Sequence, residues 1–131
     1  MDRPPLARTQ VDVRDLEARR SGLSVARFGI GYRVQEVDVF LDGAIDTVRS
    51  LLEENEGLRA GVSPEHLWFG TTQARRRLTP LDVQARVFEI GRFGNGYKMR
   101  AVDEVLDDVT DMIAALTAEN EALRARRSTS G

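Results

Sequence analysis

The residue types that could carry catalysis or bind a metal are few in this sequence of 131 residues. It holds one histidine, His66, which stands beside Glu65, and no cysteine. General acid–base chemistry needs a nucleophile or a second base within reach, and the neighbouring sequence supplies neither. The absence of cysteine excludes disulfides, cysteine-bound zinc, iron–sulfur clusters and thiol catalysis. We therefore expect a protein that is not an enzyme, has no cofactor and no metal, and resides in a reducing cytoplasm.

Two glycine-rich motifs, FGIGY at 28–32 and FGNGY at 93–97, are the other candidates for binding chemistry. Phosphate-binding glycine loops require glycine and lysine spacings that both motifs lack. We therefore expect the glycines to serve a tight turn, in which they permit positive φ and close backbone approach. These turn glycines are Gly29, Gly31, Gly94 and Gly96.

Both motifs belong to an internal duplication with an offset of 65 residues, in which residues 28–60 align without gaps to 93–125. Each copy is expected to form a short helix, a glycine loop preceded by a brief strand, and a long helix. The fold class is thus mainly α, with two tandem copies. The expected organisation is a disordered N-terminus (1–10), repeat 1 (11–60), a linker (61–77), repeat 2 (78–125) and a disordered tail (126–131). Thr79, Pro80 and Asp82 form a good helix start for repeat 2.

After each glycine loop, apolar residues recur at alternating spacings of four and three. This period of about 3.5 residues keeps a narrow apolar seam facing one partner helix, which is typical of a parallel coiled coil. The predicted seam residues are Val37, Leu41, Val48, Leu51 and Leu58 in repeat 1, and Val102, Leu106, Ile113, Leu116 and Leu123 in repeat 2.

Asn55 and Asn120 occupy the last a position of their seams. A buried asparagine there needs another asparagine across the seam, so it fixes strand number and alignment at a cost in stability. Each asparagine is flanked by the same charges, Glu54 and Arg59 in repeat 1 and Glu119 and Arg124 in repeat 2. The alternative is an ordinary amphipathic helix with a solvated asparagine, and the repetition of the pattern favours the coiled coil.

The same local rules allow two pairings. In one, the repeats pair within one chain, with Asn55 facing Asn120, Glu54 facing Arg124 and Glu119 facing Arg59. In the other, two chains form a homodimer. We favour the homodimer, because a monomer of this size would bury little around so thin a seam.

Charge is segregated along the chain. Residues 36–58 carry −6 and residues 101–123 carry −7, so the rest of the chain carries +11. The linker holds Arg75, Arg76 and Arg77, and its Trp68 is expected to cover the coil or head. Basic clusters bind phosphate backbones, so a nucleic-acid-binding regulator is the alternative function. Against it, both long helices are acidic, so no recognition helix is apparent. As to membranes, no apolar run approaches the ~18 residues that cross a bilayer.

These residues resemble the DivIVA domain, the head of a family of bacterial division-site and cell-pole scaffolds. Repeat 2 matches through LTPLDVQARVF, RFGNGY, AVDEVLDDV and LTAENEALR, and repeat 1 through LSVARFGIGY, EVDVFLD and LLEENEGLR. The resemblance implies a parallel coiled-coil dimer whose glycine loops intertwine at the head. In the family, an exposed Phe at the loop tip followed by Arg contacts lipid. Here Phe28 and Phe93 match the aromatic position, and Arg27 and Arg92 stand one residue before them.

The resemblance therefore implies a non-enzymatic scaffold or adaptor of bacterial cell division or polar growth. Its expected partners are itself or a DivIVA-family relative through the coiled coil, division or wall-synthesis proteins, and an anionic membrane surface at the glycine loops. The expected location is the cytoplasm, at the inner face of the membrane at the septum or pole. No nucleic-acid partner is expected under this hypothesis.

Overall fold

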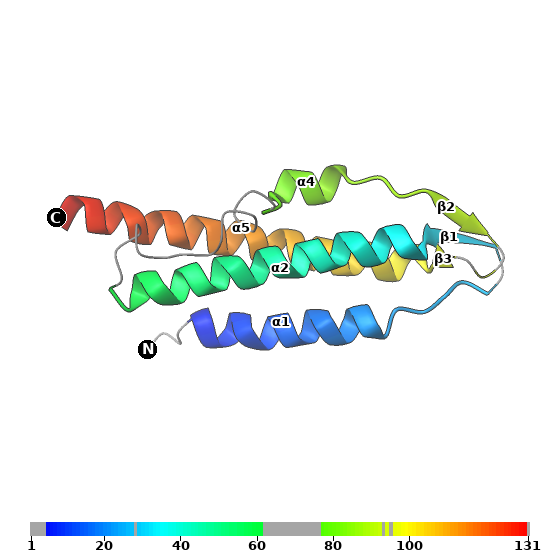
Figure 1. Ribbon diagram of the computed structural model, residues 1–131, viewed down its shortest axis with the longest axis horizontal. Helices are drawn as coiled ribbons and strands as arrows, with labels where there is room; N and C mark the ends of the chain where they lie inside the picture. Colours follow the sequence, from blue (N-terminus) through cyan, green and yellow to red (C-terminus); the bar gives the residue numbers. More distant parts are fainter. Residues whose placement is uncertain (1–4, 28, 62–76, 93, 95, 131) are drawn as a thin grey trace.

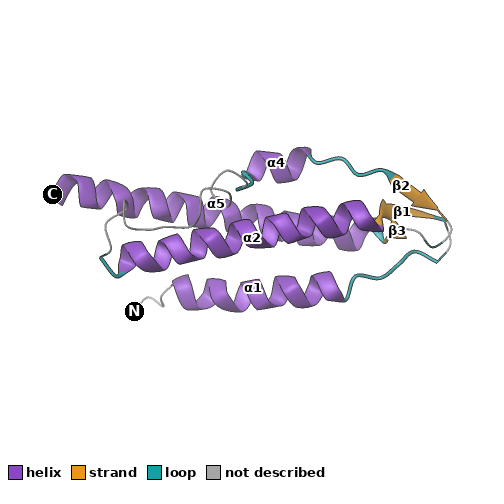
Figure 2. Cartoon of the chain, in the orientation of Figure 1, coloured by secondary structure: helices purple, strands orange, loops and turns teal. Residues whose placement is uncertain are grey.

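The computed structural model describes residues 5–27, 29–61, 77–92, 94 and 96–130. The prediction of a mainly helical fold is confirmed, and a small sheet lies at one end of the helices (Figure 2). In chain order the described elements are α1 (Pro5–Ser21), β1 (Ile30–Arg33), α2 (Val34–Arg59), α4 (Pro80–Ala85), β2 (Ile90–Arg92), β3 (Gly96–Tyr97) and α5 (Met99–Ser130).

The two long helices, α2 and α5, lie side by side and run in the same direction away from the sheet (Figure 1). α1 runs the opposite way and packs on both of them, while α4 packs against α5 on the other side. The long helices of this structure therefore pack against each other within one chain, and α1 and α4 add buried residues to the core around them.

The core follows the seam and extends into the short helices. Val13 and Leu16 of α1 and Val83 of α4 are at most 6% exposed. Phe88, which follows α4, is also buried and contacts Tyr32 and Phe40. Each short helix thus buries an apolar residue against the long pair, and this supplies apolar burial that a two-helix seam lacks.

The helices extend further than the sequence predicts. α1 begins at Pro5 and α5 ends at Ser130, so both continue into the segments 1–10 and 126–131 that were expected to be disordered. Proline is well suited to a first helical turn, which agrees with the start of α1 at Pro5. α4 begins as expected: the Thr79 side chain accepts a hydrogen bond from the Asp82 backbone, and the Asp82 carboxylate accepts one from the Thr79 backbone.

The sheet has three antiparallel strands in the order β2-β1-β3. Sequence analysis expected a brief strand before each glycine loop, but β1 and β3 lie inside the glycine motifs, where only a turn was expected. They form because repeat 1 pairs with repeat 2: Tyr32 lies opposite Ile90, and Val25 lies opposite Tyr97. These two pairs are related by the 65-residue offset, so each repeat contributes the same strand contact to the other.

The four turn glycines have two different roles. Gly29 and Gly94 have φ of 83° and 87°, in the left-handed region that favours glycine. Gly31 and Gly96 instead pack backbone against backbone. A Cβ on Gly31 would lie 2.4 Å from the Tyr97 carbonyl oxygen, and one on Gly96 would lie 2.6 Å from the Gly31 carbonyl carbon.

This contact predicts that Gly31→Ala destabilises the protein by about 1–3 kcal/mol, because the strands must separate to admit a methyl group. Gly43→Ala in α2 is the matched control, since a Cβ there meets nothing within 4 Å. Alanine is favoured over glycine inside a helix, so the control is expected to gain up to about 1 kcal/mol. Urea unfolding followed by circular dichroism measures both. Equal effects of the two substitutions would contradict the close approach.

Candidate functional site

The candidate site is the seam between α2 and α5, and its buried polar centre is an amide pair. The Asn55 amide nitrogen donates to the Asn120 side-chain oxygen at 2.9 Å. The Asn120 amide nitrogen donates to the Leu51 backbone carbonyl at 3.0 Å, and Arg59 donates to the Asn55 side-chain oxygen at 3.0 Å. Asn55 is 0% and Asn120 3% exposed. Both amides find hydrogen-bond partners in this alignment of α2 and α5. If one helix slid along the other, the amides would be left unpaired in the core.

Charged pairs flank the amides on both sides. Arg124 donates to Glu54 with Nε at 2.7 Å and also with a terminal nitrogen, and Arg59 pairs with Glu119. The structure thus brings together all six residues that the sequence singled out for register: Glu54, Asn55, Arg59, Glu119, Asn120 and Arg124.

The apolar seam residues lie where the 3.5-residue period places them. Nine of the ten are at most 8% exposed, and Leu123, near the end of the contact, is half-buried. Ala44 and Val109 fill the remaining seam positions and are fully buried.

Sequence analysis missed a second set of contacts between the repeats near the sheet. The Tyr32 hydroxyl donates to Asp103 at 3.0 Å, and the Tyr97 hydroxyl donates to Asp38 at 2.8 Å. Burial raises the pKa of both tyrosines, and the hydrogen bonds to the carboxylates raise it further. The signal was present in the sequence, because both tyrosines and both aspartates are identical between the repeats.

A third contact was also missed, and the serine and threonine that accept in it have no hydroxyl counterparts in repeat 2. Arg77, just before α4, donates to the Glu54 carboxylate at 2.8 Å, to the Ser50 hydroxyl at 2.9 Å and to the Ser50 carbonyl at 3.1 Å. The next backbone nitrogen, of Leu78, donates to the Thr47 hydroxyl at 3.0 Å. These bonds fasten the start of repeat 2 to the helix of repeat 1.

Glu54 therefore lies between two arginines, Arg77 and Arg124, and its side chain is only 5% exposed. Burial alone would raise its pKa. The hydrogen bonds and positive charges of Arg124 and Arg77 outweigh burial and hold the pKa below the ordinary value.

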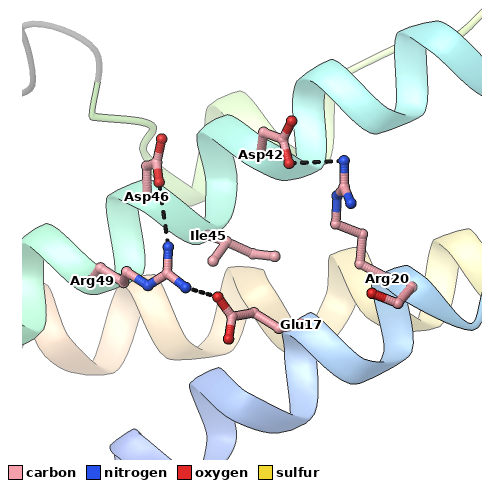
Figure 3. Close-up of a pocket in the computed structure, with 7 residues that line it drawn as sticks. Glu17, Arg20, Asp42, Ile45, Asp46 and Arg49 are labelled. Carbon is pink, nitrogen blue, oxygen red and sulfur yellow. Dashed lines mark ion pairs between the residues drawn. The ribbon is translucent and has the colours of Figure 1, made fainter.

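A polar pocket of about 450 Å³ lies between α1 and α2 (Figure 3). Its charged side chains bind one another: Arg20 pairs with Asp42 at 2.9 Å, and Arg49 pairs with Glu17 and, at 3.7 Å, with Asp46. The pairing joins the two helices, and we assign the pocket a structural role. No group of three or more histidine, cysteine or acidic residues in the described part of the chain could hold a metal ion.

The head residues expected to meet a membrane are placed only in part. Arg27, before β1, and Arg92, the last residue of β2, are both exposed. Phe28 and Phe93 lie outside the described residues, as do His66, Trp68, Arg75 and Arg76. Val25, Ile30 and Ile90 are 40–50% exposed at the same end. In the described ranges, no helix is long and apolar enough to span a membrane.

Comparison with protein-family models, with curated proteins and with solved structures found no match for this chain.

Asn55→Leu is expected to lower the free energy of unfolding by about 1–3 kcal/mol, because it leaves the Asn120 amide buried with an unpaired acceptor. The double variant Asn55→Leu with Asn120→Leu removes both amides, so most of the loss is expected to return. Chemical denaturation of wild type, of Asn55→Leu, of Asn120→Leu and of the double variant checks this. A double variant that is less stable by the sum of both single losses would show that the amides do not act as a pair.

The buried Glu54 carboxylate is expected to make the stability of the fold depend on pH. The pKa of Glu54 is lower in the folded protein than in the unfolded chain, where it is near 4.5. Ionised Glu54 therefore stabilises the fold fully above the unfolded pKa, and this stabilisation is lost as pH falls through the folded pKa. Glu54→Gln is expected to lower stability at pH 7 by about 1.5–3 kcal/mol and to weaken the acid dependence. Glu53→Gln, at the exposed neighbouring position, is the control. Urea midpoints between pH 3 and 7 that fall equally in Glu54→Gln and wild type would contradict the assignment.

Proposed function

We propose that this protein is a non-enzymatic scaffold or adaptor of bacterial cell division or polar growth, built from two DivIVA-like repeats in one chain. The observation that carries the proposal is the pairing of the repeats. Their long helices lie parallel and are aligned by the Asn55–Asn120 hydrogen bond, and strand residues of each repeat pair with those of the other. The resemblance implies this arrangement for two chains, and here one chain supplies both halves.

The proposal changes how the protein would meet its partners. The seam that was expected to bind another copy or a relative is filled by the chain's own second repeat. Contacts with division or wall-synthesis proteins would then use the outer faces of the helices and the head. One chain would then form the complete paired head, and it would not serve as one helix of a longer coiled coil between chains.

Membrane contact at the head is part of the proposal. Arg27, Arg92, Lys98 and Arg100 are exposed near the sheet, at the same end as the partly exposed Ile30. Anionic lipids attract such cations by about 1 kcal/mol each, and apolar side chains add to binding when they enter the interface.

The nucleic-acid alternative has less support. Arg77, one of the three linker arginines on which it depends, donates to Glu54 and Ser50. A side chain engaged in this way is poorly placed to neutralise a phosphate.

Co-sedimentation with anionic vesicles tests whether the head of the molecule, the end that carries the sheet, contacts the membrane. Arg27→Glu is expected to reduce the bound fraction severalfold, since it replaces an attractive charge near the surface by a repulsive one. Arg14→Glu makes the same charge change in α1, away from the sheet, and is expected to bind as wild type. Equal binding by the two variants would contradict head-first contact.

The cellular role is tested by imaging a fluorescent fusion of the full chain in dividing bacteria. The proposal predicts signal at the septum or pole. A uniform cytoplasmic signal would contradict it, whatever the vesicle experiment gives.

A further inference from the structure

The seam contacts do not by themselves choose a partner. The amide pair, the Glu–Arg pairs and the Tyr–Asp pairs each join residues that are 65 positions apart or related by that offset. Two copies of repeat 1, or two of repeat 2, could make all of them. Any preference between the repeats must therefore come from contacts that the offset does not reproduce.

The first such contact is the one between Arg77 and Glu54. The residue 65 positions before Arg77 is Asp12, which lies inside α1, so repeat 1 has no arginine at this point of its sequence. Glu54 is buried, and a buried carboxylate that loses a positive partner is destabilised. This position therefore favours repeat 2 as the partner of repeat 1.

The second contact joins α1 to α5. The Arg19 guanidinium donates a hydrogen bond to the Asp108 carboxylate. This bond is the main reason why the pKa of Arg19 is raised above its ordinary value. The equivalent of Asp108 in repeat 1 is Gly43, so a second repeat 1 would offer Arg19 no partner at this position.

The third contact is aromatic. Phe88 of repeat 2 lies 5.3 Å from the Tyr32 ring and 5.7 Å from the Phe40 ring, and the Arg86 guanidinium lies over Phe40 and Phe88 at 5.4 and 5.3 Å. In repeat 1 the equivalents of Phe88 and Arg86 are Leu23 and Ser21, which can form neither the ring–ring contacts nor the cation–π contacts.

Two copies of repeat 2 would also lose contacts. Thr47 accepts the Leu78 backbone N–H and Ser50 accepts from Arg77, but their equivalents in repeat 2 are Met112 and Ala115. Neither side chain offers an oxygen, so the start of repeat 2 would be left with unpaired donors.

We propose that the interface between the repeats is selective, so that repeat 1 accepts repeat 2 and rejects another repeat 1. Specificity of this kind can rest on favourable contacts that the wrong partner does not make. The repeat 1 of one chain consequently does not pair with the repeat 1 of a second copy. This inference concerns pairing alone, so it can fail while the scaffold role stands.

The test converts interface residues of repeat 2 into their repeat 1 equivalents within the full chain. The converted variant carries Arg77→Asp, Phe88→Leu and Asp108→Gly. A control of equal net charge carries Lys98→Arg and Ala118→Glu, conversions at exposed positions. Wild type, the converted variant and the control each also carry Leu58→Cys at the seam. Because the chain has no other cysteine, a disulfide between two chains reports that repeat 1 has met repeat 1.

We expect little disulfide-linked dimer from wild type and control after oxidation at low micromolar concentration. The converted variant is expected to give about tenfold more, the change that corresponds to a difference of roughly 1.4 kcal/mol. Equal dimer fractions in all three proteins would overturn the proposal. If circular dichroism shows that the converted variant does not fold, Arg77→Asp alone is compared with Arg14→Asp, and equal dimer fractions there would overturn it as well.

Discussion

The alignment of the whole structure depends on one buried polar contact, the hydrogen bond between Asn55 and Asn120. Two amides inside an apolar seam are stable only when they meet, because each would otherwise leave donors and acceptors unpaired away from water. The bond fixes the parallel direction and the relative position of α2 and α5. With that alignment, Glu54 and Glu119 reach the arginines of the opposite helix.

The same alignment determines the head. Because α2 and α5 begin at the same level, the strands that precede them lie within hydrogen-bonding distance, and each repeat completes a strand of the other. Gly31 and Gly96 are required there because the two backbones touch. The apolar and basic side chains of both repeats consequently gather at one end of the molecule, which is the physical basis for the proposed membrane contact.

Much of this could be predicted from the sequence, because helix faces and heptads are periodic and local. Positions such as Leu41 and Ile113, and the flanked asparagines, follow from spacing alone. The strands could not be predicted, since Tyr32 and Tyr97 pair with residues of the other repeat that are far away in the sequence. Arg77 could not be assigned to Glu54, because no periodicity links a loop residue to a helix 23 positions earlier. The choice between one chain and two was also open, since both pairings obey the same seam rules.

Distances between spin labels measured by pulsed electron resonance test the central claim most directly. Label pairs at the exposed equivalent positions 35/100 and 53/118 are expected to give short distances, because both pairs lie across two packed helices, whose axes are about 8–10 Å apart. The 35/118 pair is expected to be clearly longer, since 18 residues add about 27 Å along the helix axis. All three distances should persist when labelled protein is diluted with unlabelled chains. A short 35/118 distance would show antiparallel helices, and loss of the short distances on dilution would show pairing between chains. Either result would contradict the account.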